Sequence, residues 1–118
     1  MKKIILSLAL LIAPITAANA YLSISPSSME FGSVKIGTQD RQMFFINNIG
    51  NENVQIFSCS VFGAFECDLN CFGMLFPGQS CSGSITFQPR DEHYEFESVY
   101  INTNSFPVNM SVHGYGVL

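Results

Sequence analysis

Apolar and polar residues alternate along most of the chain after residue 20, and this period of two predicts β-strands. The pattern is clearest in residues 80–88, where Cys81, Gly83, Ile85 and Phe87 share one face and only Ser, Thr or Gln occupies the other. We expect a half-buried strand there, with one solvated face. Further strands are expected at residues 22–25, 29–31, 34–36, 41–47, 54–59, 94–102 and 108–113.

Turn residues separate these segments, and no stretch after residue 20 has a convincing 3.6-residue period. Gly50 lies in the polar turn 48–53, and a second polar turn spans residues 89–93. About seven strands in the 98 residues 21–118 predict an all-β fold, a single antiparallel β-sandwich. The expected inward positions are Phe31, Phe44, Ile46, Val54, Ile56, Ile85, Phe87, Val99, Ile101, Met110 and Val112.

Residues 60–76 do not alternate cleanly and are more apolar than a connecting segment usually is. The other strands already supply enough inward side chains for a core, so some apolar side chains of residues 60–76 can stay exposed. Exposed apolar patches usually mark interfaces. We therefore expect Phe62, Phe65, Phe72 and Met74 to form a partner-docking surface. The equal alternative is that these side chains complete the core.

The first twenty residues predict a secretory signal peptide. Lys2 and Lys3 precede the mostly apolar stretch 4–15, and Ala18-Asn19-Ala20 has the small-x-small pattern of a cleavage site. A membrane anchor is less favoured because the uninterrupted apolar run is shorter than the ~20 residues that span a bilayer. The expected mature domain is residues 21–118, with no further membrane span.

Size and charge exclude several classes of function. A chain of 118 residues leaves no room for a two-domain enzyme. Residues 21–118 carry three basic and nine acidic side chains, a net charge of −6. Three scattered cations cannot neutralise a row of phosphates, so nucleic acid is not an expected partner, and anionic membrane surfaces are disfavoured for the same reason.

The four cysteines are Cys59, Cys67, Cys71 and Cys81, an even number in a chain expected to be exported. Disulfides are the favoured interpretation. A structural zinc site is less favoured because the spacing contains no C-x-x-C and no His lies within the cluster. Four cysteines allow three pairings, and the spacing alone leaves all three open.

Six segments follow one another in an order that resembles a known family. They are Met29–Gly37 (MEFGSVKIG), Phe45–Gly50 (FINNIG), Phe76–Cys81 (FPGQSC), Ile85–Pro89 (ITFQP), Val99–Asn104 (VYINTN) and Val112–Gly116 (VHGYG). Together they resemble the bacterial choice-of-anchor D domains and, more widely, the ASH and major sperm protein group of immunoglobulin-like sandwiches.

The resemblance implies that the β-sandwich of about seven strands is immunoglobulin-like, and it implies a binding or assembly role with no catalytic residues. It also implies that Cys71 pairs with Cys81, which leaves Cys59 with Cys67. The sequence departs from the family pattern in the turn 91–93, where Asp-Glu-His stands in place of the usual Gly. This departure concerns the local turn and not the fold.

The sequence offers no clear catalytic or metal-binding constellation. His93 and His113 are the only histidines, and neither has a Ser or Cys partner suggested by its position. An acidic group at residues 91, 92, 95 and 97 would supply oxygens for a cation site, but we favour the interpretation that Glu95 and Glu97 lie on a solvated strand face. We expect no enzyme activity, no metal and no cofactor.

These observations predict an exported interaction module. The favoured function is a small structural subunit of a bacterial cell-envelope assembly, such as a secretion machine, a pilus or a surface complex, with other envelope proteins as partners. The expected location is the periplasm, the outer cell envelope or the exterior. The alternative is a free periplasmic binding or chaperone-like protein that captures a peptide strand or a metal ion.

Overall fold

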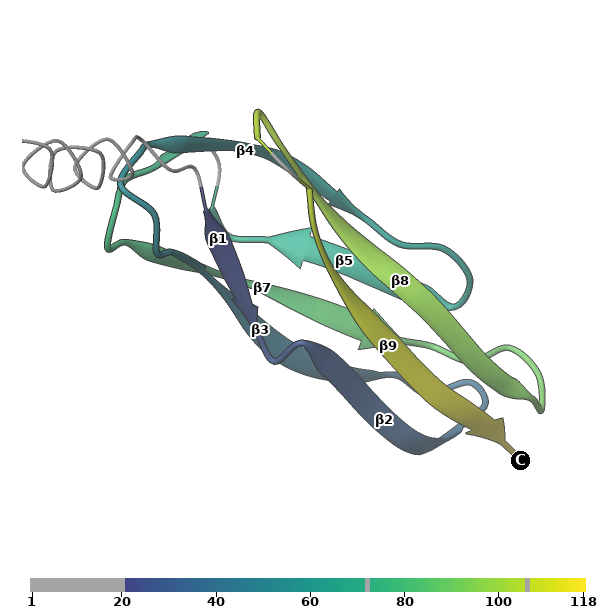
Figure 1. The fold of residues 1–118 in the computed structure, drawn as a ribbon. Coiled ribbons are helices and arrows are strands. Elements are labelled where there is room, and N and C mark those ends of the chain that lie inside the picture. Colours follow the sequence, from purple (N-terminus) through teal and green to yellow (C-terminus); the bar gives the residue numbers. More distant parts are fainter. Residues whose placement is uncertain (1–20, 72, 106) are drawn as a thin grey trace, which may run out of the picture.

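The computed structural model describes residues 21–71, 73–105 and 107–118, which fold into nine β-strands in two sheets (Figure 1). The expected signal peptide, residues 1–20, lies outside the described residues. The two sheets pack face to face, and the all-β sandwich expected from the alternating pattern is confirmed.

One sheet, which we call sheet A, has four strands that all pair antiparallel. In spatial order its strands are β1 (Leu22–Ser25), β3 (Asp40–Asn48), β7 (Ser80–Phe87) and β5 (Phe65–Leu69). Strand β7 is therefore an interior strand with neighbours on both sides.

The other sheet, sheet B, has five strands. In spatial order they are β2 (Ser28–Lys35), β9 (Val108–Val117), β8 (Tyr94–Thr103), β4 (Val54–Ser60) and β6 (Gly73–Leu75). Strand β2 runs parallel to β9, so the expectation of an entirely antiparallel sandwich is wrong at this pair, and the other pairs are antiparallel. Strand β8 lies in the middle of this sheet and, like β7 of sheet A, has neighbours on both sides.

The expected count of about seven strands is too low. The difference comes from residues 60–78, which contain β5 and β6. These strands have five and three residues, too few for an alternating pattern to stand out. Strand β9 also continues past Gly114, where we expected it to end. A Cβ atom at Gly114 would lie 2.5 Å from the Phe87 ring, so glycine lets the strand run on above that ring.

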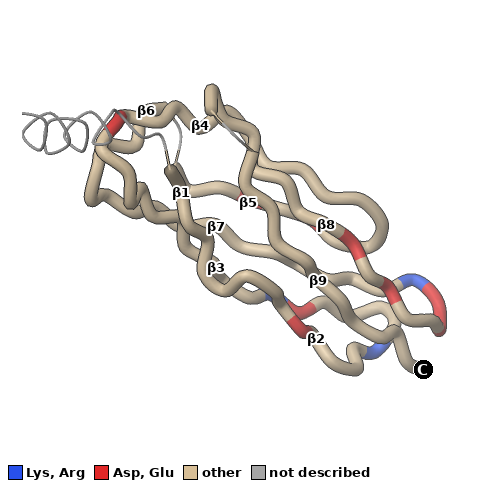
Figure 2. Tube along the Cα trace, viewed as in Figure 1, with Lys and Arg blue, Asp and Glu red and all other residues tan. Residues whose placement is uncertain are grey.

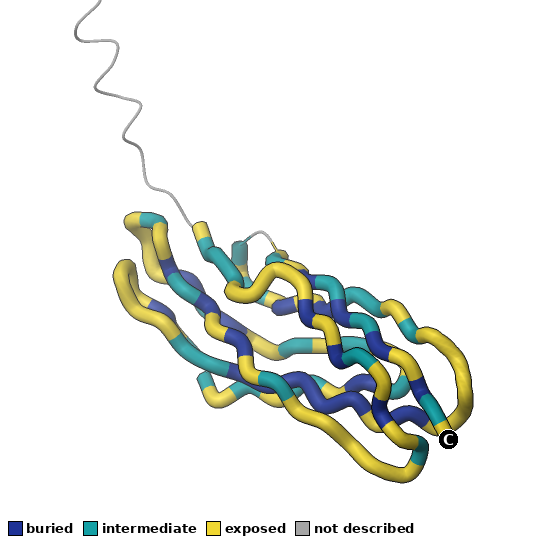
Figure 3. The backbone as a smooth tube through the Cα atoms, turned by 90° about the horizontal axis from the view of Figure 1, so that it is seen from below, coloured by how far each residue is buried: buried dark blue, intermediate teal, exposed yellow. Residues whose placement is uncertain are grey.

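The core lies between the sheets, and buried positions alternate with exposed ones along the strands (Figure 3). All eleven expected inward residues are buried. Met29, Val34, Phe65 and Leu75 belong to the same apolar cluster. The rings of Phe31, Phe65 and Phe87 contact one another with centroid separations of 4.7–5.9 Å. Burial of these side chains at roughly 1.5–3 kcal/mol each is the main force that holds the sheets together.

The face of β7 that we expected to be solvated is partly covered. Ser84 and Thr86 are buried although they point away from the core. Ser84 lies between Met43 of β3 and Asp68 of β5 in the strand register. An interior strand with small side chains is screened from water by the longer side chains on both neighbours.

Asn48 is a buried polar residue that organises one end of the sandwich. Its Nδ2 group donates to the carbonyl oxygens of Glu52 and Leu75, both at 2.8 Å, and its Oδ1 accepts from the Gly50 amide. Its backbone carbonyl accepts from the amide of Gly78 at 2.9 Å. A buried amide that makes these bonds avoids the cost of an unsatisfied polar group and joins β3, β6 and two turns.

Candidate functional site

Two disulfides hold the segment that joins β4 to β7. Cys59 of β4 is bonded to Cys67 of β5, so this disulfide links sheet B to sheet A, with a Cα–Cα distance of 6.1 Å. Cys71 is bonded to Cys81 at the start of β7, and the Cα–Cα distance is 5.5 Å. These are the two pairs that the family resemblance implies.

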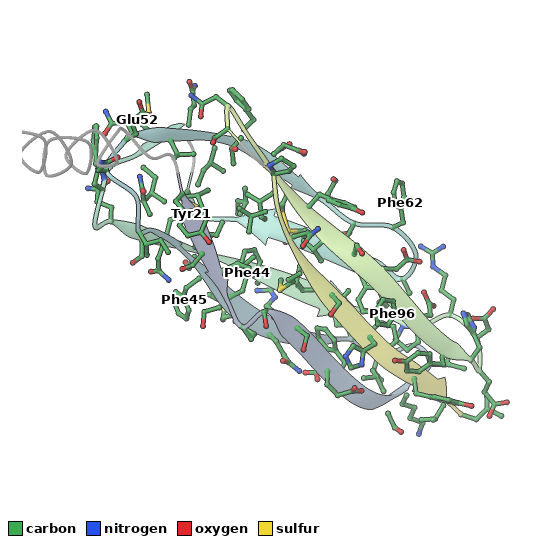
Figure 4. The ribbon with its side chains drawn as sticks, in the orientation of Figure 1. Tyr21, Phe44, Phe45, Glu52, Phe62 and Phe96 are labelled. Atoms are coloured by element: carbon green, nitrogen blue, oxygen red, sulfur yellow. A yellow bond between two sulfur atoms is a disulfide. The ribbon has the colours of Figure 1, made fainter. Side chains whose placement is uncertain are left out.

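The predicted docking residues do not share one environment. Phe62 lies in the β4–β5 loop with 73% of its surface exposed and points away from the body of the domain (Figure 4). Phe65 is only 5% exposed, and its ring stacks on Phe87 at 4.7 Å. Phe65 is therefore a core residue, and its assignment to a docking surface is wrong. Phe72 lies outside the described residues.

The two exposed members of the set also lie far apart. Met74 is half-exposed on β6, opposite Gln55 near the start of β4. Phe62 follows the other end of β4. Because a strand rises about 3.3 Å per residue, the length of β4 separates the two side chains by roughly 20 Å. Residues 60–76 do not form a single surface.

Strand β8 reverses the pattern that we expected. Phe96 is 58% exposed and projects outward from β8 (Figure 4), whereas the side chain of Glu95 is only 12% exposed. The interpretation of Glu95 and Glu97 as a solvated strand face is therefore wrong. The sequence already indicated this orientation. Alternate residues of a strand share a face, so positions 95 and 97 lie on the same side as the inward residues Val99 and Ile101.

The outward side chains of β8 and β9 form a group that we call the aromatic face, which consists of Tyr94, Phe96, His113 and Tyr115. Phe96 stacks on His113 with a centroid distance of 5.7 Å, and Tyr94 lies 6.3 Å from Tyr115. Nδ1 of His113 contacts the carboxylate of Glu30 on β2. This face was not identified from the sequence, because Glu95 and Glu97, and not their neighbour Phe96, were placed on the solvated side of the strand.

A second group lies at the start of β8 and consists of Asp91, His93 and Glu95, which we call the DHE cluster. Nδ1 of His93 lies 2.7 Å from a carboxylate oxygen of Asp91, and Nε2 lies 3.5 Å from Oε2 of Glu95. Oε1 of Glu95 accepts a hydrogen bond from the Ala64 amide at 3.1 Å. Acidic residues gather at this end of the domain, near the C-terminus (Figure 2).

Two of the cavities in the described part of the chain are small, with volumes of about 150 and 210 Å³. The smaller one is lined mainly by polar residues, among them Glu66, Thr86 and Arg90. Small-molecule sites usually enclose roughly 300–1,000 Å³. In that same part, all four cysteines are disulfide-bonded and no helix is long and apolar enough to cross a membrane.

The sequence matches a known family over most of its length. The model of the HYDIN/CFA65/VesB-like, Ig-like domain matches residues 20–116. None of the curated proteins matches the chain.

Solved structures share the fold at low sequence identity. The secreted serine protease VesC from Vibrio cholerae is 17% identical with a TM-score of 0.66, and the match covers 83% of this chain and 23% of that one. A protein of unknown function from Porphyromonas gingivalis is 15% identical with a TM-score of 0.70, over 85% of this chain and 48% of that one. The chain thus spans less than half of either protein.

A third structure is a single domain of similar size. The ASH/PapD-like domain 7 of human CEP192 is 17% identical with a TM-score of 0.63, and the match covers 81% of this chain and 84% of that domain. The resemblance to the immunoglobulin-like ASH group that was expected from the ordered sequence segments is confirmed.

Proposed function

Because the chain belongs to the HYDIN/CFA65/VesB-like Ig-like domain family, we propose that it is a non-enzymatic interaction module, a small structural subunit of a cell-envelope assembly. The observation that carries this proposal is the aromatic face. Three aromatic side chains, Tyr94, Phe96 and Tyr115, each expose about half of their surface on one side of sheet B. Side chains of this kind are enriched at protein interfaces.

Export is the second part of the proposal. The signal-peptide pattern of residues 1–20 supports it, and so do the two disulfides, which persist in oxidising compartments and are rare in the cytosol. The VesC protein, one of the structures that share the fold, is itself described as secreted.

The aromatic face suits docking because its geometry is fixed before a partner arrives. Strands β8 and β9 are paired over eight consecutive residues from Tyr94 to Ile101, and the rings contact one another across that pairing. Little conformational entropy is then lost on binding. Burial of one exposed ring contributes roughly 1.5–3 kcal/mol, so two or three rings can supply most of the energy of a specific contact.

Phe62 and Met74 remain candidate contacts within this proposal. Each is exposed, and the Cys59–Cys67 disulfide joins the two strands that flank the β4–β5 loop, which carries Phe62. Since the two side chains are separated by the length of β4, they would contact different parts of a partner or different partners.

Site-specific photo-crosslinking in the intact cell envelope tests the proposal. A photoreactive phenylalanine analogue replaces Phe96 on the aromatic face, and the control carries it in place of Met43, which is similarly exposed on the outer side of sheet A. We expect a discrete adduct of one partner from position 96 and no such adduct from position 43. No adduct at 96, or the same adducts from both positions, would overturn the assignment of the aromatic face.

A further inference from the structure

The first half of β8 places carboxylates where the fold calls for core residues. Glu95 and Glu97 lie on the same face of the strand as the buried residues Val99 and Ile101. Charged side chains on an inward face lower stability unless another group compensates them. Such breaks of the binary pattern are found mainly at functional sites.

His93 lies between two of the acidic side chains at this position. Its Nδ1 atom is 2.7 Å from Asp91, a hydrogen-bond distance. Its Nε2 atom is 3.5 Å from Oε2 of Glu95, which is longer than a good hydrogen bond. Two ligands of one tetrahedral ion with bonds of about 2.0–2.1 Å lie roughly 3.4 Å apart. The spacing of Nε2 and Oε2 therefore fits two ligands that share a metal ion.

We propose that the DHE cluster binds a divalent transition-metal ion, with Zn²⁺ as the best-matched case. Nε2 of His93 and Oε2 of Glu95 are direct ligands. The carboxylate of Asp91 lies 2.7 Å from Nδ1, on the other side of the ring, where it would orient the imidazole and would not contact the ion itself. Water fills the remaining positions.

The imidazole decides which class of ion binds. Zn²⁺, Ni²⁺ and Cu²⁺ bind nitrogen ligands strongly, whereas Ca²⁺ and Mg²⁺ take oxygen ligands almost exclusively. A site for Ca²⁺ would need six to eight oxygens, and this cluster offers two carboxylates and a histidine. We therefore expect strong preference for Zn²⁺ over Ca²⁺.

Glu95 is held in place before any ion binds. The Ala64 amide donates to Oε1, which leaves Oε2 directed toward His93. Gly63 makes this contact possible, because a Cβ atom at that position would lie 2.8 Å from Oε1 and because Gly63 has a φ of +74°. The β4–β5 loop therefore orients the Glu95 carboxylate toward His93.

Isothermal titration with ZnCl₂ tests the proposal on the chelator-treated protein, purified without a polyhistidine tag. We expect one Zn²⁺ per chain, an affinity at least tenfold weaker in His93→Ala, and a similar loss in Glu95→Gln. His113→Ala is the matched control, since it removes the other histidine and leaves the cluster intact. Circular dichroism must show that each variant is folded.

A second readout locates the ion. Substoichiometric Ni²⁺ should broaden the backbone amide NMR signals of residues 91–96 and 63–64 before those of β3. Equal Zn²⁺ affinity in the His93→Ala variant, equal loss in His113→Ala, or Ca²⁺ binding as tight as Zn²⁺ would overturn the proposal. These outcomes are independent of the photo-crosslinking result, because the two experiments probe different groups of residues.

Discussion

Strands β7 and β8 are both interior strands, one in each sheet, yet their two faces are built differently. Strand β7 places Ile85 and Phe87 inward and only Ser or Thr outward. Strand β8 places Val99 and Ile101 inward in its second half, but in its first half carboxylates point inward and aromatic rings point outward. Apolar residues inward and polar residues outward is the usual rule for such a strand. The part of β8 that breaks this rule adjoins both the aromatic face and the DHE cluster.

The difference shows that β8 is not shaped by stability alone. A sandwich gains most by burying aromatic rings and exposing carboxylates. Strand β8 gives up part of this gain over residues 94–97. We interpret the reversal as the consequence of a binding role for this end of the domain, and the variants below test that interpretation.

The largest effect is expected where both strands follow the rule. Phe87→Ala removes a fully buried ring that packs on Phe31 and Phe65, and it should lower the free energy of unfolding by about 3–5 kcal/mol. Ile101→Ala, the counterpart on β8, should cost about 2–5 kcal/mol. Urea unfolding followed by circular dichroism measures both. A cost below 1 kcal/mol for Ile101→Ala would mean that β8 contributes little to the core.

The next largest loss of stability is expected on removal of the disulfide that joins the two sheets. Replacing Cys59 and Cys67 together by Ser opens a loop with a sequence separation of 8, and the loop-entropy relation gives a loss of about 2–3 kcal/mol. The same urea unfolding under non-reducing conditions measures the loss. Peptide mapping of the unreduced protein provides the control, and recovery of Cys59 linked to Cys81 would contradict the pairing on which the prediction depends.

Replacing an inward carboxylate of β8 by an apolar side chain should stabilise the protein. Glu97→Leu places an apolar side chain on the inward face beside Val99 and removes a charge from the vicinity of Glu95, so we expect a gain of roughly 1 kcal/mol. Glu66→Leu, on an exposed position of β5, is the matched control and should change stability by less than about 0.5 kcal/mol. If Glu97→Leu is destabilising, the inward carboxylate is itself structural.

Sequence patterning predicted the fold far better than the site. The eleven inward residues were identified correctly because each lies in a strand long enough to show a period of two. Phe65 was misassigned because β5 has five residues, and its pattern is obscured by the apolar residues around it. The DHE cluster was found only in part: we considered the acidic residues 91, 92, 95 and 97 as ligands of a cation and set them aside, and we considered His93 only as a catalytic residue. The bond that orients Glu95 could not be predicted, because it joins β8 to the β4–β5 loop, which is distant in sequence.

The reversal on β8 was nevertheless visible in the sequence. Val99 and Ile101 were correctly placed inward, and the period of two then requires Glu95 and Glu97 to share that face. We gave the chemical preference of glutamate for water more weight than the strand parity. The structure shows that parity was the stronger constraint.

The smallest stability effect is expected at the residue that matters most for the proposed function. Phe96→Ser removes a ring that is 58% exposed, so the free energy of unfolding should change by no more than about 0.5 kcal/mol. Association with a partner should nevertheless weaken by about tenfold or more, because burial of such a ring contributes roughly 1.5–3 kcal/mol. Paired measurements of urea unfolding and of partner dissociation decide the matter. A variant that loses both stability and partner would show that the outward ring of β8 supports the fold, and the contrast with β7 would then have a structural cause.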